Sequence, residues 1–108
     1  MLRRVSTGTR AVARAPTVGE RFRGTRMVAF VAPGSGSVIF VAGRRVGSAV
    51  ERNRARRILR AAWHELAFGV GEGYDIALVA RRTIRGAKTQ DLVVEMRELL
   101  ARARVLRT

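Results

Sequence analysis

The chain has 108 residues, of which 47% are hydrophobic, so it is large enough for one domain with its own core and too apolar for a disordered polycation. Arginine and lysine total 22 against 8 acidic residues, and the resulting formal charge of +14 predicts a polyanionic partner. With no cysteine and a single histidine, disulfides, thiolate metal sites and histidine-cluster metal sites are excluded.

Residues 1–25 are predicted to form a basic arm with weak local order. They are rich in arginine and interrupted by glycine and proline, and a short helix around Arg10–Arg14 is all the regular structure we expect there. The arm lacks the apolar stretch of a secretory signal, and no apolar run in the chain approaches the ~20 residues that cross a bilayer. We therefore expect a cytoplasmic protein with no membrane partner.

Residues 26–108 are predicted to form a single α/β domain that begins with two strands. The apolar run Met27–Ala32 is typical of a strand, and the cluster Pro33–Ser37 is typical of a turn. A second strand, Val38–Ala42, should then pair antiparallel to the first. Because both runs are continuously apolar, we expect the sheet to be covered on at least part of both faces.

Two helices and a third strand are predicted in the remainder of the chain. Ser48 can cap a helix from about Ala49 to Ala67, a span without proline or glycine. A glycine-rich turn leads to a third strand, Tyr74–Ala80, and Thr89 can cap a last helix that ends near Val105. The apolar residues of this last helix recur at helical spacing, which predicts that it packs on the core.

The helix of residues 49–67 has two chemically different faces when its residues are placed at about 100° intervals. One face should pack on the sheet, and it carries Ala55, Ile58, Leu59, Ala62, Trp63 and Leu66. The other face is basic, and it carries Asn53, Arg56, Arg57, Arg60 and His64, with Arg54 beside them and Arg52 at the seam. His64 is the lone histidine, and a neutral surface role is its plainer interpretation.

The basic face has almost no acidic residue to balance it. Like charges one helical turn apart cost an isolated helix roughly 0.2–0.5 kcal/mol per pair, whereas a partner that supplies phosphates makes the same charges favourable. A solvated charged face is the alternative interpretation.

Arg44 and Arg45 precede the helix start, where free backbone N–H groups also favour anions. Lys88 is the only lysine, and two explanations compete for the preference for arginine: coding bias in a GC-rich genome, and the fit of arginine to phosphate.

The segment Arg44–Arg60 resembles the signature segment of the bacterial ribonuclease P protein family. It has two basic residues, a glycine, an Ala-Val pair, Arg-Asn-Arg and further basic positions on the same helix. The later segment Tyr74–Arg82 is similar to the next strand of the family. The resemblance is good from Val38 to Arg82 and holds in the order of elements from Arg26 to the end.

The resemblance implies an α/β (α+β) two-layer sandwich with a small sheet, similar to domain 2 of ribosomal protein S5. It also implies a left-handed β-α-β crossover, although general rules alone favour the right-handed form. In function, it implies a subunit of the ribonuclease P holoenzyme that binds the catalytic RNA and precursor tRNA, so that residues 26–108 are an RNA-binding domain. The RNA subunit would cleave off the 5′ leader, and this chain would contribute no catalytic residue.

The residues that the resemblance assigns to RNA binding are Arg44, Arg45, Arg52, Asn53, Arg54, Arg56, Arg57 and Arg60. The family also has a cleft for the single-stranded 5′ leader, usually lined by two aromatics on a short first helix, which this chain lacks. Phe30 matches an aromatic position on the first strand, and Phe22, Arg81 and Arg82 complete the predicted leader cleft. The holoenzyme is expected to need Mg²⁺ held mainly by the RNA, with none bound tightly by this chain and no obligate protein partner.

The sequence offers three alternatives to this interpretation. A metal-dependent nuclease needs converging carboxylates, and the eight acids of this chain are scattered. A basic amphipathic helix resting on a membrane would need its apolar face free, whereas the sheet uses that face. The leading rival is a ribosomal or general structured-RNA-binding protein without a role in tRNA processing, which shares the charge but not the ordered signature.

Overall fold

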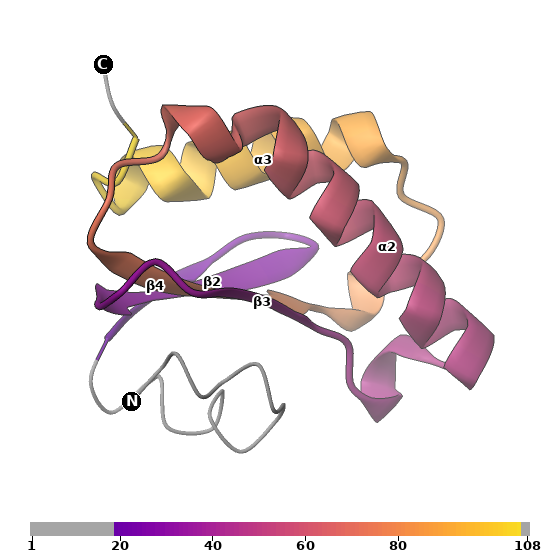
Figure 1. The fold of residues 1–108 in the computed structure, drawn as a ribbon. Helices are drawn as coiled ribbons and strands as arrows, with labels where there is room; N and C mark the ends of the chain where they lie inside the picture. Colours follow the sequence, from indigo (N-terminus) through magenta and orange to yellow (C-terminus); the bar gives the residue numbers. More distant parts are fainter. Residues whose placement is uncertain (1–18, 107–108) are drawn as a thin grey trace.

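The computed structural model describes residues 19–106, which form a four-stranded sheet with two α-helices on one face (Figure 1). The strands are β1 (Glu20–Arg23), β2 (Met27–Pro33), β3 (Val38–Val41) and β4 (Tyr74–Ala80). The α-helices are α2 (Ala49–Leu66) and α3 (Thr89–Arg102), and the short 3-10 helices are η2 (Arg44–Val46), η3 (Ala67–Gly69) and η4 (Arg82–Ile84). The predicted two-layer α+β class is confirmed.

The strand order in the sheet is β1-β2-β4-β3, so the last strand along the chain lies between β2 and β3. β2 pairs antiparallel with β1 and with β4, whereas β3 pairs parallel with β4. The prediction that the second strand pairs directly with the first is therefore wrong. The two strands predicted first, β2 and β3, form where they were expected. However, β4 lies between them, because the turn after β2 carries the chain across the start of β4.

That turn is held by a buried carboxylate at the start of β4. Asp75 is only 4% exposed, and its Oδ1 accepts the backbone N–H groups of Ser35 at 3.1 Å, Gly36 at 3.0 Å and Ser37 at 2.8 Å. A Cβ at Gly34 would lie within 1.8 Å of the Asp75 carboxylate, so the close approach requires glycine there. Asp75 thus fixes the path by which the chain passes from β2 to β3.

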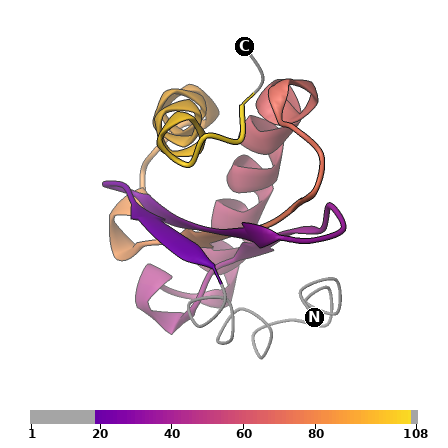
Figure 2. The ribbon, with the colours of Figure 1, turned by 90° about the vertical axis from the view of Figure 1, so that its left-hand side faces the viewer.

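The segment β3-α2-β4 is a left-handed crossover between parallel neighbours. In Figures 1 and 2 the chain leaves β3, passes above the sheet as α2 and returns to β4 on the side nearer β2. The handedness implied by the family resemblance is confirmed, against the general preference for right-handed crossovers. The crossover places the long basic helix diagonally over the sheet, with its start near the ends of β3 and β4.

The start of α2 is fixed by a capping box. The Ser48 hydroxyl accepts the backbone N–H of Glu51 at 3.3 Å, and the Glu51 carboxylate accepts the backbone N–H of Ser48 at 2.9 Å. Arg85 pairs with the same carboxylate at 2.7 Å. The predicted cap and the predicted start of this helix are confirmed, and its end lies one residue before the predicted one.

The pKa of Glu51 lies below its ordinary value because its carboxylate accepts the Ser48 N–H and lies beside the Arg85 guanidinium. Glu51 therefore stabilises the fold above its unfolded pKa, and this contribution is lost as the pH falls through the folded pKa. We expect Glu51→Gln to lower the melting temperature at neutral pH and to have little effect in acid. The exposed Glu72→Gln is the control, and an equal deficit at both pH values would contradict the capping role.

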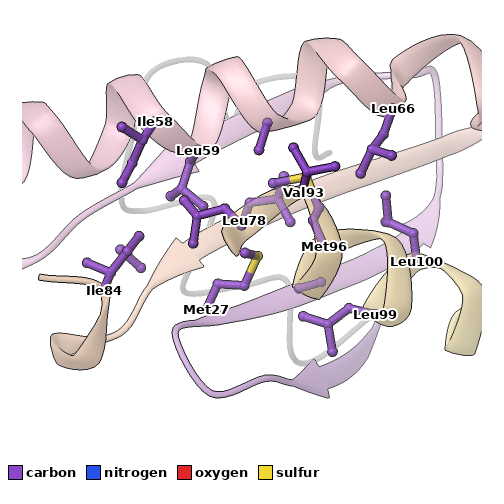
Figure 3. Close-up of a cluster of buried hydrophobic side chains, with 14 of the residues drawn as sticks. Met27, Ile58, Leu59, Leu66, Leu78, Ile84, Val93, Met96, Leu99 and Leu100 are labelled. Atoms are coloured by element: carbon purple, nitrogen blue, oxygen red, sulfur yellow. The ribbon is translucent and has the colours of Figure 1, made fainter. Parts of the chain in front are cut away.

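The core lies between the two helices and the face of the sheet that they cover (Figure 3). Its large, fully buried side chains are Met27, Leu59, Leu78, Ile84, Leu92, Met96, Leu99 and Leu100. Figure 3 shows Leu59 of α2, Leu78 of β4 and Met96 of α3 converging in this layer. The apolar side of α2 is therefore fully used in packing, and its basic side is left on the outside.

Further boundaries differ from the prediction, and α3 ends at Arg102 rather than near Val105. Residues 20–23 belong to the sheet as β1 rather than to an arm, and Phe22 of this strand packs against the core. Thr89 is the first residue of α3 rather than its cap, because Lys88 occupies the cap position and donates its N–H to Asp91 at 2.9 Å. The short helix expected around residues 10–14 lies outside the described residues.

Both described helices cover the same face of the sheet, so its other face is open within residues 19–106. Along β2, Met27, Ala29 and Val31 are buried beneath the helices, while the alternating Val28 and Phe30 lie on the open face and are only partly buried. On the same face β4 continues the apolar surface with Ala77 and Val79, whereas β1 places Arg21 and Arg23 beside Phe30 and Val28. Ala32 and Ala77 on this second face are nevertheless buried, so the expectation that at least part of both faces is covered stays a prediction.

Candidate nucleic-acid interface

The basic side of α2 forms an exposed arginine face. Its members are Arg52, Asn53, Arg54, Arg56, Arg57 and Arg60, which lie opposite the buried side of the same helix. Asn53, Arg57 and Arg60 are exposed, and the other three are partly buried. None of these arginines pairs with an acid, because the ion pairs in residues 19–106 are Arg26 with Glu95 and Arg85 with Glu51. The positive charge of the face is therefore available to an external anion.

Three arginines of this face are held by backbone carbonyls. Arg52 donates to the carbonyl of Gly47 at 3.0 Å, and Arg54 donates to that of Ala87 at 2.6 Å. Arg56 approaches the carbonyl of Ala42 at 3.5 Å and also donates to the Asn53 side chain. These carbonyls lie in loops around the helix start and before α3, so the hydrogen bonds orient the guanidinium groups and tie α2 to its neighbours.

Arg57 and Arg60 keep more of their donors available. Arg57 makes no hydrogen bond or ion pair with the other described side chains or backbone groups. The Arg60 guanidinium lies 5.4 Å from the centre of the Phe40 ring, a cation–π contact that leaves its N–H groups free at the edge. The structure thus separates the predicted RNA-binding arginines into an oriented group and a group with free donors, a distinction that helical spacing alone does not predict.

Arg44 and Arg45 lie on η2, between the end of β3 and the cap of α2. Both side chains are exposed, while Val46 of the same turn is buried and anchors it. Arg45 lies with Arg81 and Arg82 around a hollow of about 490 Å³ at the end of β4. The sequence predicted RNA binding for Arg45 and a place in the leader cleft for Arg81 and Arg82. The structure brings all three side chains around one hollow.

The predicted leader cleft needs one correction. Phe30 lies on the open face of the sheet, where its register partner on β1 is Arg21. Phe22 pairs with Ala29, a core residue, and packs against the core on the helix side. Because the two rings lie on opposite faces of the sheet, they cannot line one cleft. Phe30 alone remains a candidate for base stacking.

The described residues give little support for a histidine-based site, a metal site or a membrane-spanning helix. His64 is exposed near the end of α2. No group of three histidine, aspartate or glutamate side chains that could hold a metal ion occurs within residues 19–106. Across the same residues, neither helix combines the length and the apolar character that a membrane span requires.

The chain is similar to known proteins in both sequence and fold. The model of the family described as Ribonuclease P matches residues 10–104 of the chain. This chain belongs to the ribonuclease P protein family. The match includes β1 to α3 and the whole arginine face, so the family assignment covers the candidate interface.

Several relatives carry the name ribonuclease P protein component. One from Pelotomaculum thermopropionicum is 41% identical over 69 residues, which are 64% of this chain and 62% of that protein. One from Dehalococcoides mccartyi is 37% identical over 67 residues, 62% of this chain and 54% of that protein. The chain therefore spans less than two thirds of these two relatives. A third, from Chloroflexus aggregans, is 35% identical over 94 residues, 83% of this chain and 70% of its own length.

Solved structures of the ribonuclease P protein share the fold. The protein from Thermotoga maritima superposes with a TM-score of 0.75 at 18% identity over 94% of both chains. The protein from Staphylococcus aureus superposes with a TM-score of 0.74 at 17% identity, over 92% of this chain and 94% of that one. These similarities show that the two-layer fold of this chain is the fold of the ribonuclease P protein.

Proposed function

We propose that this chain is the protein subunit of ribonuclease P. In this role it binds the catalytic RNA and precursor tRNA and supports endonucleolytic removal of the 5′ leader, while the RNA subunit performs the cleavage. The observation that carries the proposal is the exposed arginine face of α2, none of whose guanidinium groups pairs with an acid within residues 19–106. Membership in the ribonuclease P protein family supports ribonuclease P RNA as one partner, and precursor tRNA as the second partner is part of the proposal.

The arginine face acts through electrostatics and geometry. Each planar guanidinium can donate two N–H groups to phosphate oxygens, and binding releases the counterions condensed on the RNA. Because Arg52, Arg54 and Arg56 are already held by backbone carbonyls, they lose less conformational entropy on binding than free side chains would. Arg57 and Arg60 supply the free donors.

The same charges explain how the protein supports a reaction that it does not perform. Phosphates crowd together where the catalytic RNA and the precursor meet, and their repulsion opposes substrate binding at low ionic strength. Guanidinium groups that neutralise these phosphates reduce the concentration of Mg²⁺ that assembly requires. In this proposal the Mg²⁺ is held mainly by the RNA, where it stabilises the charge that develops during cleavage.

The test is the cleavage of a precursor tRNA by ribonuclease P RNA at low Mg²⁺, with and without this protein. We expect the wild-type chain to stimulate cleavage, and Arg57→Ala with Arg60→Ala to reduce the stimulation about fivefold to tenfold. These two positions are chosen because neither side chain is tied to a backbone carbonyl. Arg97→Ala with Arg104→Ala removes the same charge from exposed positions on and after α3 and should retain the stimulation.

The outcomes of this experiment separate the proposal from its rival. Loss of stimulation in the α2 variant but not in the α3 variant supports a subunit that acts through the arginine face. Equal binding to any structured RNA, with no effect on cleavage by either variant or by the wild-type chain, would identify a general RNA-binding protein instead. Thermal melts of both variants exclude unfolding as the cause.

A further inference from the structure

The two edges of the sheet differ in the residues of their strands. β1, at one edge, carries the charged side chains of Glu20, Arg21 and Arg23. Charged residues on an edge strand discourage other strands from pairing with it. β3, at the other edge, has the sequence Val-Ile-Phe-Val, without a charge, a proline or a glycine. The β3 edge is therefore apolar and lacks the protection that β1 has.

Backbone groups of β3 point away from the sheet at alternate residues. The Ile76 N–H donates to the Ser37 carbonyl at 2.8 Å, and this bond sets which residues of β3 face β4. In a parallel ladder each residue directs both of its backbone groups to one side, so Val38 and Phe40 direct theirs to the outer edge. No strand within residues 19–106 pairs with that edge. The β3 edge thus offers both donors and acceptors to another chain.

Two arginines of α2 border the later part of this edge. In Figure 1, β3 runs toward η2, and α2 returns above the sheet in the opposite sense. Arg56 approaches the carbonyl of Ala42 at 3.5 Å, and the Arg60 guanidinium lies 5.4 Å from the centre of the Phe40 ring. Neither arginine belongs to the two ion pairs of residues 19–106. This part of the β3 edge is therefore positively charged.

A second hollow, of about 370 Å³, lies at the start of β3. Its lining includes the partly buried side chains of Val38, Trp63 and Tyr74 and the buried Val70. No cation lines it, and its one charged lining residue is Glu72. The hollow therefore suits an apolar side chain and disfavours an acidic one. Along the β3 edge, the features that α2 borders follow in the order hollow, Arg60, Arg56.

We propose that the β3 edge binds an extended acidic segment of another protein, which adds a strand to the sheet. The added strand hydrogen-bonds to the outward backbone groups of Val38 and Phe40, and side-chain contacts give it specificity. Antiparallel addition is the more stable direction, and alternate side chains of the added strand then face α2. Two acids in succession lie beside Arg56 and Arg60, and the apolar side chain that follows enters the hollow.

A second copy of the chain and an RNA strand fit this edge less well. Pairing of two β3 edges would place two basic α2 helices side by side, in a chain whose formal charge is already +14. Phosphates accept hydrogen bonds but cannot donate them to the edge carbonyls, whereas a peptide strand does both. Under the proposed function RNA also contacts Arg56 and Arg60, so the acidic segment is a partner of the RNA-free chain.

The first experiment titrates the full chain with a short capped peptide that carries glutamate, glutamate and phenylalanine at alternate positions. Trp63 is the only tryptophan, so its fluorescence reports occupancy of the hollow. We expect the fluorescence to change and the amide protons of Val38 and Phe40 to exchange more slowly when the peptide is bound. Absence of binding, or equal binding of a peptide with the same residues in scrambled order, would overturn the proposal.

The second experiment removes one outward donor of the edge. Val38→Pro eliminates an N–H that points away from β4, so the ladder between β3 and β4 is retained. We expect this variant to weaken peptide binding at least about fivefold, because one backbone hydrogen bond is lost. Val38→Ala keeps the N–H and is the matched control, with an expected loss below about threefold. Equal affinities of the two variants would rule out strand addition.

An exchange of charge keeps the proposal testable if Val38→Pro does not fold. Arg60→Glu should weaken binding of the glutamate peptide about threefold to fivefold and strengthen binding of its lysine counterpart. Arg97→Glu makes the same change of charge at an exposed position of α3, and it should change either affinity less than about twofold. Equal effects at the two positions would show that the peptide responds only to net charge, against the proposal.

Two further results would assign the edge to another occupant. Self-association of the free chain that Val38→Pro abolishes would assign it to a second copy. A lower affinity for ribonuclease P RNA in Val38→Pro than in Val38→Ala would assign it to RNA. Either result would overturn this proposal, and the proposed function is tested separately by precursor cleavage.

Discussion

Replacing Asp75 with alanine is expected to lower the free energy of unfolding by about 2–4 kcal/mol. The carboxylate is buried and accepts three backbone N–H groups from the turn after β2. Hydrogen bonds to a charged group contribute about 1.5–3 kcal/mol each, but water can replace part of them in this exposed turn. Because small domains have only about 5–15 kcal/mol in total, the variant should unfold at a much lower urea concentration.

Two controls locate the effect of this substitution. Glu72→Ala removes an acid three residues earlier from an exposed position, and it should leave the urea midpoint nearly unchanged. Asp75→Asn keeps one acceptor oxygen without the charge, so we expect an intermediate loss. An Asp75→Ala variant that unfolds at the same urea concentration as Glu72→Ala would show that the carboxylate does not hold the turn.

Replacing Phe30 with alanine is expected to weaken the affinity of the holoenzyme for precursor tRNA by about 5-fold to 150-fold. This range corresponds to about 1–3 kcal/mol for the stacking of one base on an aromatic side chain. Phe30 lies beside Ala77 of β4, on the face of the sheet that the helices leave open within residues 19–106, so under the proposed function its ring is the candidate for stacking a leader base. The dissociation constant for the leader-bearing precursor measures the effect directly.

The specificity of that loss matters more than its size. Affinity for tRNA without a leader should be unchanged, and Phe68→Ala, which removes an 86% exposed ring on η3, should affect neither RNA. Phe30→Leu retains an apolar side chain but no ring, so it should lose nearly as much leader affinity as Phe30→Ala while keeping more of the stability. Full affinity in Phe30→Leu would assign Phe30 to packing alone.

Local sequence patterns predicted most of the secondary structure. The third strand forms over Tyr74–Ala80 as expected, and α2 begins at Ala49 because Ser48 and Glu51 complete a capping box visible in the sequence. β1 was missed because Phe22 is the only apolar residue of its four, and charged neighbours are typical of an edge strand. The pairing of β3 was missed because strand order depends on contacts distant in sequence.

In the candidate site, too, the features set by local sequence were predicted, and those that depend on distant contacts were not. The arginine face of α2 was predicted because helical spacing determines which residues share a side. The tethers of Arg52, Arg54 and Arg56 could not be predicted, because each depends on the position of a loop carbonyl. The meeting of Arg45 with Arg81 is a result of the parallel β3–β4 pairing, which brings the ends of two strands together. The opposite orientation of Phe22 and Phe30 follows from the register of β1.

The position of β4 in the middle of the sheet also determines when the sheet can form during synthesis. β1 and β2 are adjacent in the chain and can pair as soon as both have left the ribosome. β3 has no partner until β4 emerges, because it pairs only with β4 among the described strands. The nascent chain must therefore extend past Ala80 before β3 and the arginine helix acquire their places. Until then, the apolar strand β3 is an unpaired segment that chaperones can bind.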